Sequence, residues 1–149
     1  MKKRLFLAVL TFCIVQFMTS AQSFDRISQI LDSEAITMGQ AAYLAGTYAK
    51  LVDERADEKA AFETLKGKGC FSDTDSFDTV ITLKKLCSVF AVIVDFKGGF
   101  MYTVTKKSPR YSYKEFQARG FIPGSADPGM KVSGINAVAL FNKITGSAK

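Results

Sequence analysis

AFETLKGKGCFSDTDSFDTVITLKKLCSVF, residues 61–90, and SYKEFQARGFIPGSADPGMKVSGINAVALF, residues 112–141, decide the fold of this chain. The two stretches repeat each other at an offset of 51 residues without a gap. Apolar positions fall on apolar positions, as Phe90 does on Phe141, and the one shared glycine keeps its place. Self-similarity at such a period indicates stacked supersecondary units, which we expect to form a scaffold or a binding module.

Three helix starts share one pattern: an apolar residue, a hydroxyl residue and then apolar residues at helical spacing. The three pairs that begin them are Ile36-Thr37, Ile81-Thr82 and Val132-Ser133. A hydroxyl at this cap position accepts a hydrogen bond from an amide of the first turn. Gln40 stands three residues after Thr37 and completes a capping box. The run at 89–94 would suit a buried strand, but its match to the second repeat favours a helix.

A shorter helix is expected before each of the last two starts, at residues 57–67 and 111–119. Gly69 and Gly120 follow these helices, and glycine takes the left-handed C-cap conformation most easily. Residues 24–32 resemble a truncated first helix, so the chain holds about two and a half units. The predicted fold is all-α.

The segment between the second and third units, residues 96–109, breaks the helical pattern. Gly98-Gly99 is expected to end the second long helix. Residues 101–105 alternate weakly between apolar and polar, which predicts a loop with one short extended stretch.

The N-terminus has the order of a secretory signal peptide: basic residues at 2–4, an apolar run at 5–15 and small residues at 19–21. We expect cleavage after Ala21, or alternatively after Ser23. Residues 22–149 then form one exported, periplasmic domain without a transmembrane helix. The full chain has a net charge of +6, and loss of the signal leaves +3, which is too weak for a nucleic-acid-binding protein.

The chemistry of common catalytic and metal sites is missing from the sequence. The chain has no histidine, which excludes imidazole acid–base catalysis. Asp73, Asp75 and Asp78 have the early spacing of a calcium loop, but the required glycine and bidentate glutamate do not follow. We therefore predict no enzyme activity, no metal and no cofactor.

Cys70 and Cys87 are the cysteines that remain after signal cleavage. Both fall on core positions of the repeat, so an oxidising compartment would allow a disulfide between them. The alternative is two reduced thiols that act as small apolar core residues. The sequence leaves both possibilities standing.

Several motifs resemble the S-layer homology family. GFIPG at 120–124 and DPG at 127–129 are similar to its "G-I-I-x-G … D-G" connection. VSGINA at 132–137, ITMGQA at 36–41 and ITLKKL at 81–86 lie where that family has its "I-T-R-A-E" helix start. The resemblance implies helix-loop-helix units in one helical domain.

The centre of the chain also resembles small exported periplasmic proteins of spirochaetes. The shared pattern is "G-G-x-M-Y … P-R-Y-x-Y", carried by Gly98, Gly99, Met101, Tyr102, Pro109, Arg110, Tyr111 and Tyr113.

The S-layer homology ligand site does not carry over. In that family the arginine of "T-R-A-E" helps to hold an anionic cell-wall polysaccharide. Here its positions are Met38, Leu83 and Gly134, none of which is basic. The resemblance therefore implies the architecture without the family's ligand residues.

One segment is both basic and aromatic, and it is the candidate surface for a protein partner or a glycan. Its residues are Tyr102, Lys106, Lys107, Arg110, Tyr111 and Lys114. Tyrosine and arginine are favoured in protein interfaces, and basic residues beside aromatic rings also suit an anionic glycan. We predict a non-enzymatic structural or adaptor protein of the cell envelope that acts through protein contacts or forms a homo-oligomer. The alternative is a module that binds peptidoglycan or another anionic glycan.

Overall fold

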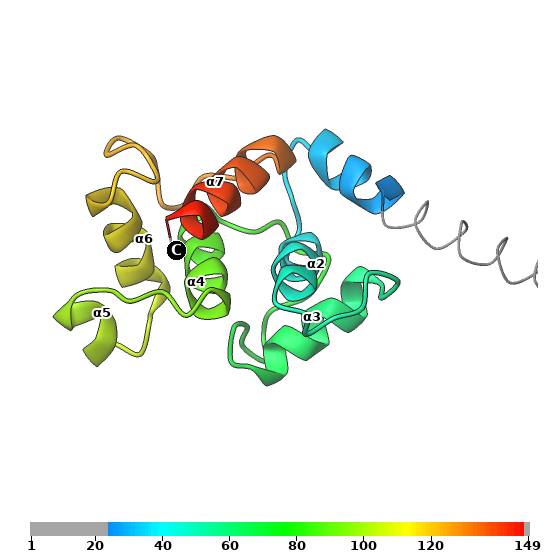
Figure 1. Ribbon diagram of the computed structural model, residues 1–149, viewed down its shortest axis with the longest axis horizontal. Coiled ribbons are helices and arrows are strands. Elements are labelled where there is room, and N and C mark those ends of the chain that lie inside the picture. The colour runs from blue at the N-terminus through cyan, green and yellow to red at the C-terminus, as the bar shows by residue number, and fades with distance from the viewer. Residues whose placement is uncertain (1–23, 148–149) are drawn as a thin grey trace, which may run out of the picture.

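The computed structural model describes residues 24–147, and this part of the chain is all-helical with no strand (Figure 1). Residues 24–32 form a first helical segment. The helices that follow are α2 (Met38–Tyr48), α3 (Glu58–Gly67), α4 (Leu83–Ile93), α5 (Phe100–Val104), α6 (Pro109–Ala118) and α7 (Gly134–Gly146). The predicted fold class is therefore confirmed.

The three long helices α2, α4 and α7 begin side by side. The short segments that lead into them, residues 33–37, 77–82 and 128–133, are joined by backbone hydrogen bonds, and we call this junction the hub. Ile36, Ile81 and Val132 are the apolar residues before the caps, and all three are buried there. Branched apolar residues at one repeat position thus form the centre of the fold.

Each pair of segments in the hub is held by backbone bonds, so the junction is closed. The amide of Ile81 donates to the carbonyl of Ile36 at 3.0 Å, and the amide of Ile36 donates to the carbonyl of Val132 at 2.9 Å. The third contact is made by the amide of Leu83, which donates to the carbonyl of Met130 at 2.9 Å. Three similar sequence segments therefore make similar contacts around one centre.

Aromatic rings join the long helices beyond the hub. Phe90 of α4 lies 4.7 Å from Phe141 of α7, and Tyr48 of α2 lies edge-on to the same ring at 5.0 Å. The short helices pack outside, with α3 against α2 and α6 against α4 (Figure 1). Each short helix therefore packs on the long helix that precedes it in the chain.

Two of the three predicted caps are confirmed. The Thr37 hydroxyl accepts from the Gln40 amide, and the Gln40 side chain accepts from the Thr37 amide, both at 3.1 Å. The Ser133 hydroxyl accepts from the amide of Asn136. Thr82 occupies the cap position of α4 but its side chain makes no cap hydrogen bond, so that part of the prediction is wrong. The first amides of α4 donate to the carbonyls of residues 130 and 128, as the first amides of α2 donate to those of residues 79 and 77.

The predicted glycine caps are confirmed. Gly69 and Gly120 have φ values of 79° and 73°, in the left-handed region. Their amides donate back to Lys66 and Gln117, which closes the ends of α3 and α6. Both glycines therefore occupy backbone positions at which a side chain would be strained.

The segment after α4 differs from its prediction. Gly98-Gly99 does not end the helix, because α4 stops at Ile93 and Asp95 takes the left-handed conformation. The expected extended stretch is the helix α5, in which the amide of Thr103 donates to the carbonyl of Gly99. Helical backbone bonds outweigh the weak alternation of side chains in this segment.

The predicted signal peptide, residues 1–21, lies outside the described residues. Within the described range, none of the helices has both the length and the apolar character needed to cross a bilayer.

Candidate functional site

In the structure, some residues of the predicted basic and aromatic surface are buried and others are exposed. Tyr102 is only 1% exposed, so it is a core residue and its assignment to the surface is wrong. The helical turn of α5 directs its ring inward, where it packs edge-on against Phe96 at 5.8 Å. Burial raises the pKa of Tyr102 to about 12, with smaller contributions from Asp95 and Glu115.

The basic residues of that segment have different surroundings. Lys107 is half-buried and forms an ion pair with Asp95 at 3.0 Å. Lys106, Arg110 and Lys114 are exposed, and the Lys114 ammonium lies 5.8 Å from the centre of the half-buried Tyr111 ring. The surface that remains for a ligand is these three cations and one ring face.

Cys70 and Cys87 are both buried and both free. The structure therefore corresponds to the second alternative, two reduced thiols without a disulfide bond between them. Burial raises the pKa of Cys70 to about 11 and that of Cys87 to about 12. A protonated buried thiol is a poor nucleophile, so neither cysteine has the surroundings of a reactive site.

The acidic loop after α3 does not gather its carboxylates. Asp73 pairs with Lys66 at 3.4 Å, and Asp75 pairs with Lys85 at 2.8 Å. Asp78 accepts from the hydroxyl of Ser76. Within residues 24–147 no group of three potential metal ligands comes together.

Three grooves lie beside the three long helices at matching positions. The tenth residue after each cap is Thr47 in α2, Val92 in α4 and Lys143 in α7, and each lines a groove. We call these the α2, α4 and α7 grooves. The three hollows thus share one repeat position, which sequence reasoning did not predict.

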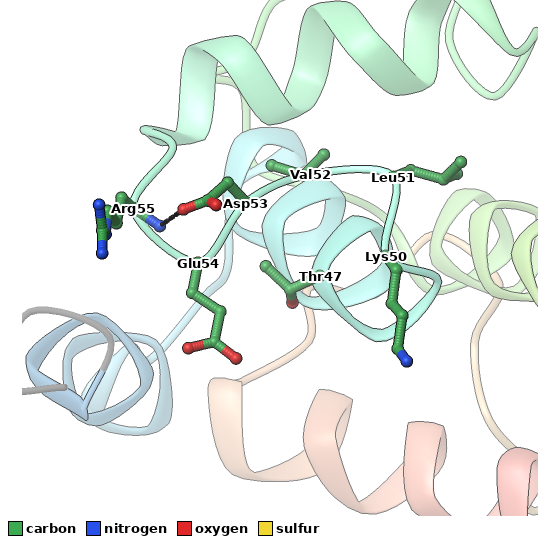
Figure 2. A pocket seen from close by; sticks show the side chains of 7 residues that line it. All are labelled: Thr47, Lys50, Leu51, Val52, Asp53, Glu54 and Arg55. Atoms are coloured by element: carbon green, nitrogen blue, oxygen red, sulfur yellow. Dashed lines mark hydrogen bonds between the residues drawn. The ribbon is translucent and has the colours of Figure 1, made fainter. Parts of the chain in front are cut away.

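The α2 groove has a volume of about 490 Å³ and lies against the loop that follows α2. It is lined by Thr47 and by residues 50–55, the segment that follows α2. Figure 2 shows the side chains of Lys50 and Glu54 on the same side of this loop as Thr47. The hydroxyl of Tyr43 donates to the backbone carbonyl of Glu54 at 2.9 Å and holds the loop in place.

The α4 groove has a volume of about 220 Å³. Residues 106–109, which follow α5, form one of its walls. The hydroxyl of Ser88 donates to the backbone carbonyl of Lys107 at 3.2 Å. Ser88 is the sixth residue after its cap, as Tyr43 is after Thr37. One repeat position therefore fastens a wall segment of both grooves.

The α7 groove lacks this fastening among the described residues. It has a volume of about 440 Å³ and is lined by Leu83, by α7 and by parts of the loop at 121–132. Its sixth position after the cap is Ala139, which has no hydroxyl to hold a segment. The alignment of Ser88 with Ala139 was the sequence signal for this difference.

The lining of the α7 groove is mostly apolar. Its apolar members are Leu83, Phe121, Ile122, Pro123, Ala126, Met130, Val132, Ala139 and Leu140. Among the described residues, Lys143 is the one ionisable side chain that lines it. An apolar hollow with a single charge at its edge suits an apolar group of a protein better than a sugar polymer.

No family model matches the chain, and neither the curated proteins nor the solved structures contain a match.

Proposed function

We propose that this chain is a non-enzymatic structural or adaptor protein of the cell envelope, exported to the periplasm, that acts through protein–protein contacts at the α7 groove. The observation that supports this is the mostly apolar lining of the groove, in contrast to the α2 groove, whose lining includes Lys50, Asp53, Glu54 and Arg55. Exposed apolar hollows of this kind mark sites of protein contact. The hub of three related helix starts supports a scaffold similar to S-layer homology domains.

The experiment is site-specific photocrosslinking in cells, with the photoreactive residue at Ala139 in the groove. The matched control places it at Ile135, which is exposed on the same helix but does not line the groove. We expect a protein adduct at position 139 alone, and we expect Met130→Asp in the groove wall to abolish it. Equal adducts at both positions, or none at 139, would contradict the proposal.

Export is tested separately. Osmotic shock should release the protein with the periplasmic contents, and its N-terminus should begin at Gln22, or at Phe24 if cleavage follows Ser23. A product that stays with the cytoplasm and retains Met1 would contradict the assignment.

A second candidate is a module that binds peptidoglycan or an anionic glycan. It is favoured by the exposed cations Lys106, Arg110 and Lys114 around the ring of Tyr111. Replacing the three cations by alanine should then abolish co-sedimentation with peptidoglycan sacculi. The control variant replaces Lys59, Lys68 and Lys84, which are also exposed and give the same change of charge. Equal loss in both variants would indicate a nonspecific charge effect and would overturn the glycan function.

A further inference from the structure

We propose that helix α5 is a membrane-contact face, which binds the surface of a bilayer that contains anionic phospholipids. The contact is peripheral: apolar side chains of α5 enter the boundary between headgroups and acyl chains, and lysines beside them bind lipid phosphates. This inference goes beyond the proposed function and uses no residue of the α7 groove.

The apolar part of this face is α5 itself, the short helix at the edge of the molecule beside α6 (Figure 1). Its sequence is FMYTV and contains no charged residue. Phe100 is 79% exposed, Met101 is 48% exposed and Val104 is 58% exposed. Phe100 and Val104 are four residues apart, so they share the outward side of the helix, opposite the buried Tyr102.

A hollow that contains three lysines lies along one side of α5. It has a volume of about 380 Å³, and its lining includes Lys97, Thr103, Lys106 and Lys107. Thr103 is exposed and lies three residues from Phe100 on the helix, so the lysines flank the apolar side chains. The amide of Lys107 donates to the carbonyl of residue 102 at 2.9 Å, which returns the chain to α5 and fixes this arrangement.

The hollow keeps a net positive charge. Asp95 is shared by two of the lysines, with contacts of 2.5 Å to Lys97 and 3.0 Å to Lys107. Lys106 is exposed and forms no ion pair within residues 24–147. Three ammonium groups against one carboxylate leave positive charge for a phosphate.

The excess of cations in the molecule is concentrated at this end. Residues 95–119, which contain α5 and α6, carry six cations and two carboxylates. The other described residues, 24–94 and 120–147, carry ten cations and twelve carboxylates. Such a distribution orients the molecule with α5 toward an anionic surface.

A phospholipid surface complements both parts of the face. Its phosphates lie above its acyl chains, so the lysines gain anionic partners while Phe100, Met101 and Val104 leave water. A sugar polymer would pair with the cations but leave these apolar side chains exposed.

The face is held in place before any lipid binds. The carboxylate of Glu115 in α6 accepts from the amide of Gly99 at 3.0 Å, and the guanidinium of Arg119 donates to the carbonyl of Lys97 at 2.6 Å. Both bonds fix the start of α5, which lowers the entropy cost of binding.

The test is co-sedimentation of the processed chain, purified from cells, with vesicles of equal parts phosphatidylglycerol and phosphatidylcholine. The processed chain is used because the apolar run at 5–15 would itself enter lipid. We expect binding that is about tenfold weaker on pure phosphatidylcholine. Phe100→Asp should weaken binding to the mixed vesicles about tenfold, without a change in melting temperature, because this side chain is exposed. The matched control Ile135→Asp, at a position 65% exposed in α7, makes the same change of charge and should bind as the wild type does.

The lysines are tested by Lys106→Gln, which should weaken binding to the mixed vesicles about fivefold. Lys84→Gln in α4 removes the same charge at another exposed position and is the control.

A fluorophore sensitive to its surroundings gives a second measurement that does not depend on the aspartate variant. Attached at Phe100→Cys, it should shift its emission to the blue on the mixed vesicles, and attached at Ile135→Cys it should not. The native Cys70 and Cys87 are buried, and the wild-type chain is the control for their labelling.

Equal binding by Phe100→Asp and Ile135→Asp, equal binding to the two kinds of vesicle, or binding to neither would overturn the inference. Binding to peptidoglycan sacculi without binding to vesicles would overturn it too, and would assign the lysines to the glycan candidate. A protein captured by a photoreactive residue at position 100, without binding to vesicles, would make α5 a protein interface instead. The photocrosslink at Ala139 tests the proposed function independently, because Ala139 lines the α7 groove.

Discussion

Gly134 and Ile30 lie so close together that the backbone carbonyl of Ile30 occupies the place of a Cβ on residue 134. The amide of Gly134 also donates to the carbonyl of Ser33 at 2.8 Å. The matching first residues of α2 and α4 are Met38 and Leu83, which have room for side chains. Glycine at 134 therefore allows the segment at 24–32 to pack against the start of α7.

Gly134→Ala should destabilise the fold, because the added methyl group meets backbone that cannot rotate away. We expect a loss of about 2–4 kcal/mol in the free energy of unfolding, at or above the usual cost of overpacking. The control is Gly146→Ala in the last turn of the same helix, where a Cβ meets nothing within 4 Å. Urea unfolding of both variants measures the difference. Equal stability of the two would show that the segment at 24–32 moves aside freely.

Alanine at the two left-handed glycines should lower the stability of the fold, whereas alanine at a helical glycine nearby should raise it. Gly69→Ala and Gly120→Ala have space for the methyl group, so their cost is the backbone alone, about 1 kcal/mol each. Gly67→Ala, two residues before Gly69 and inside α3, should gain about 0.5–1 kcal/mol because alanine favours the helix. Thermal unfolding of the three variants checks the signs. A loss of stability at 67 comparable to that at 69 would contradict the explanation.

Most of the architecture could be predicted from the sequence repeat. Apolar residues before the caps, hydroxyl caps and glycines after the short helices are local signals, and they predicted α2, α3, α4, α6 and α7 with small errors at the ends. Thr82 shows where such signals fail: α4 begins where the pattern places it, but the Thr82 hydroxyl makes no cap hydrogen bond.

The candidate site was less accessible to sequence reasoning. Tyr102 belongs to a basic and aromatic segment, yet the turn of a five-residue helix buries it. The α7 groove depends on which segment lies across a helix, and pattern along the chain does not contain that information. Only the contrast of Tyr43 and Ser88 with Ala139, read across three units, points to a difference between the three grooves.

Asp75 should contribute to stability in a pH-dependent manner. Burial acts to raise the pKa of its carboxyl, but hydrogen bonds from Lys85 and Ser72 outweigh it and hold the pKa below the ordinary 3.8. The ionised pair therefore stabilises the fold at neutral pH, and this contribution is lost as the pH falls below 3.8 through the folded-state pKa.

Asp75→Asn should cost about 1.5–3 kcal/mol at pH 7, the usual range for a hydrogen bond to a charged group, and the deficit should shrink in acid. The control is Asp73→Asn in the same loop, whose carboxylate is fully exposed and whose ion pair we expect to contribute nothing measurable. Urea unfolding of both variants at pH 7 and below pH 3 tests this. A deficit for Asp75→Asn that is constant with pH would rule out the charged pair as its source.

The buried thiols should be silent in the folded protein. With burial raising the pKa of Cys70 to about 11 and that of Cys87 to about 12, almost no thiolate exists at pH 8, and the side chains are shielded from reagent. We expect Ellman's reagent to react at least a hundredfold more slowly than with a free cysteine. Cys70, 4% exposed in the turn after α3, should react before Cys87, which is fully buried. Denaturant should release both thiols without a reductant. Release that requires a reductant would show that the protein carries the Cys70–Cys87 disulfide, and fast reaction of the folded chain would show that the core around α4 opens readily.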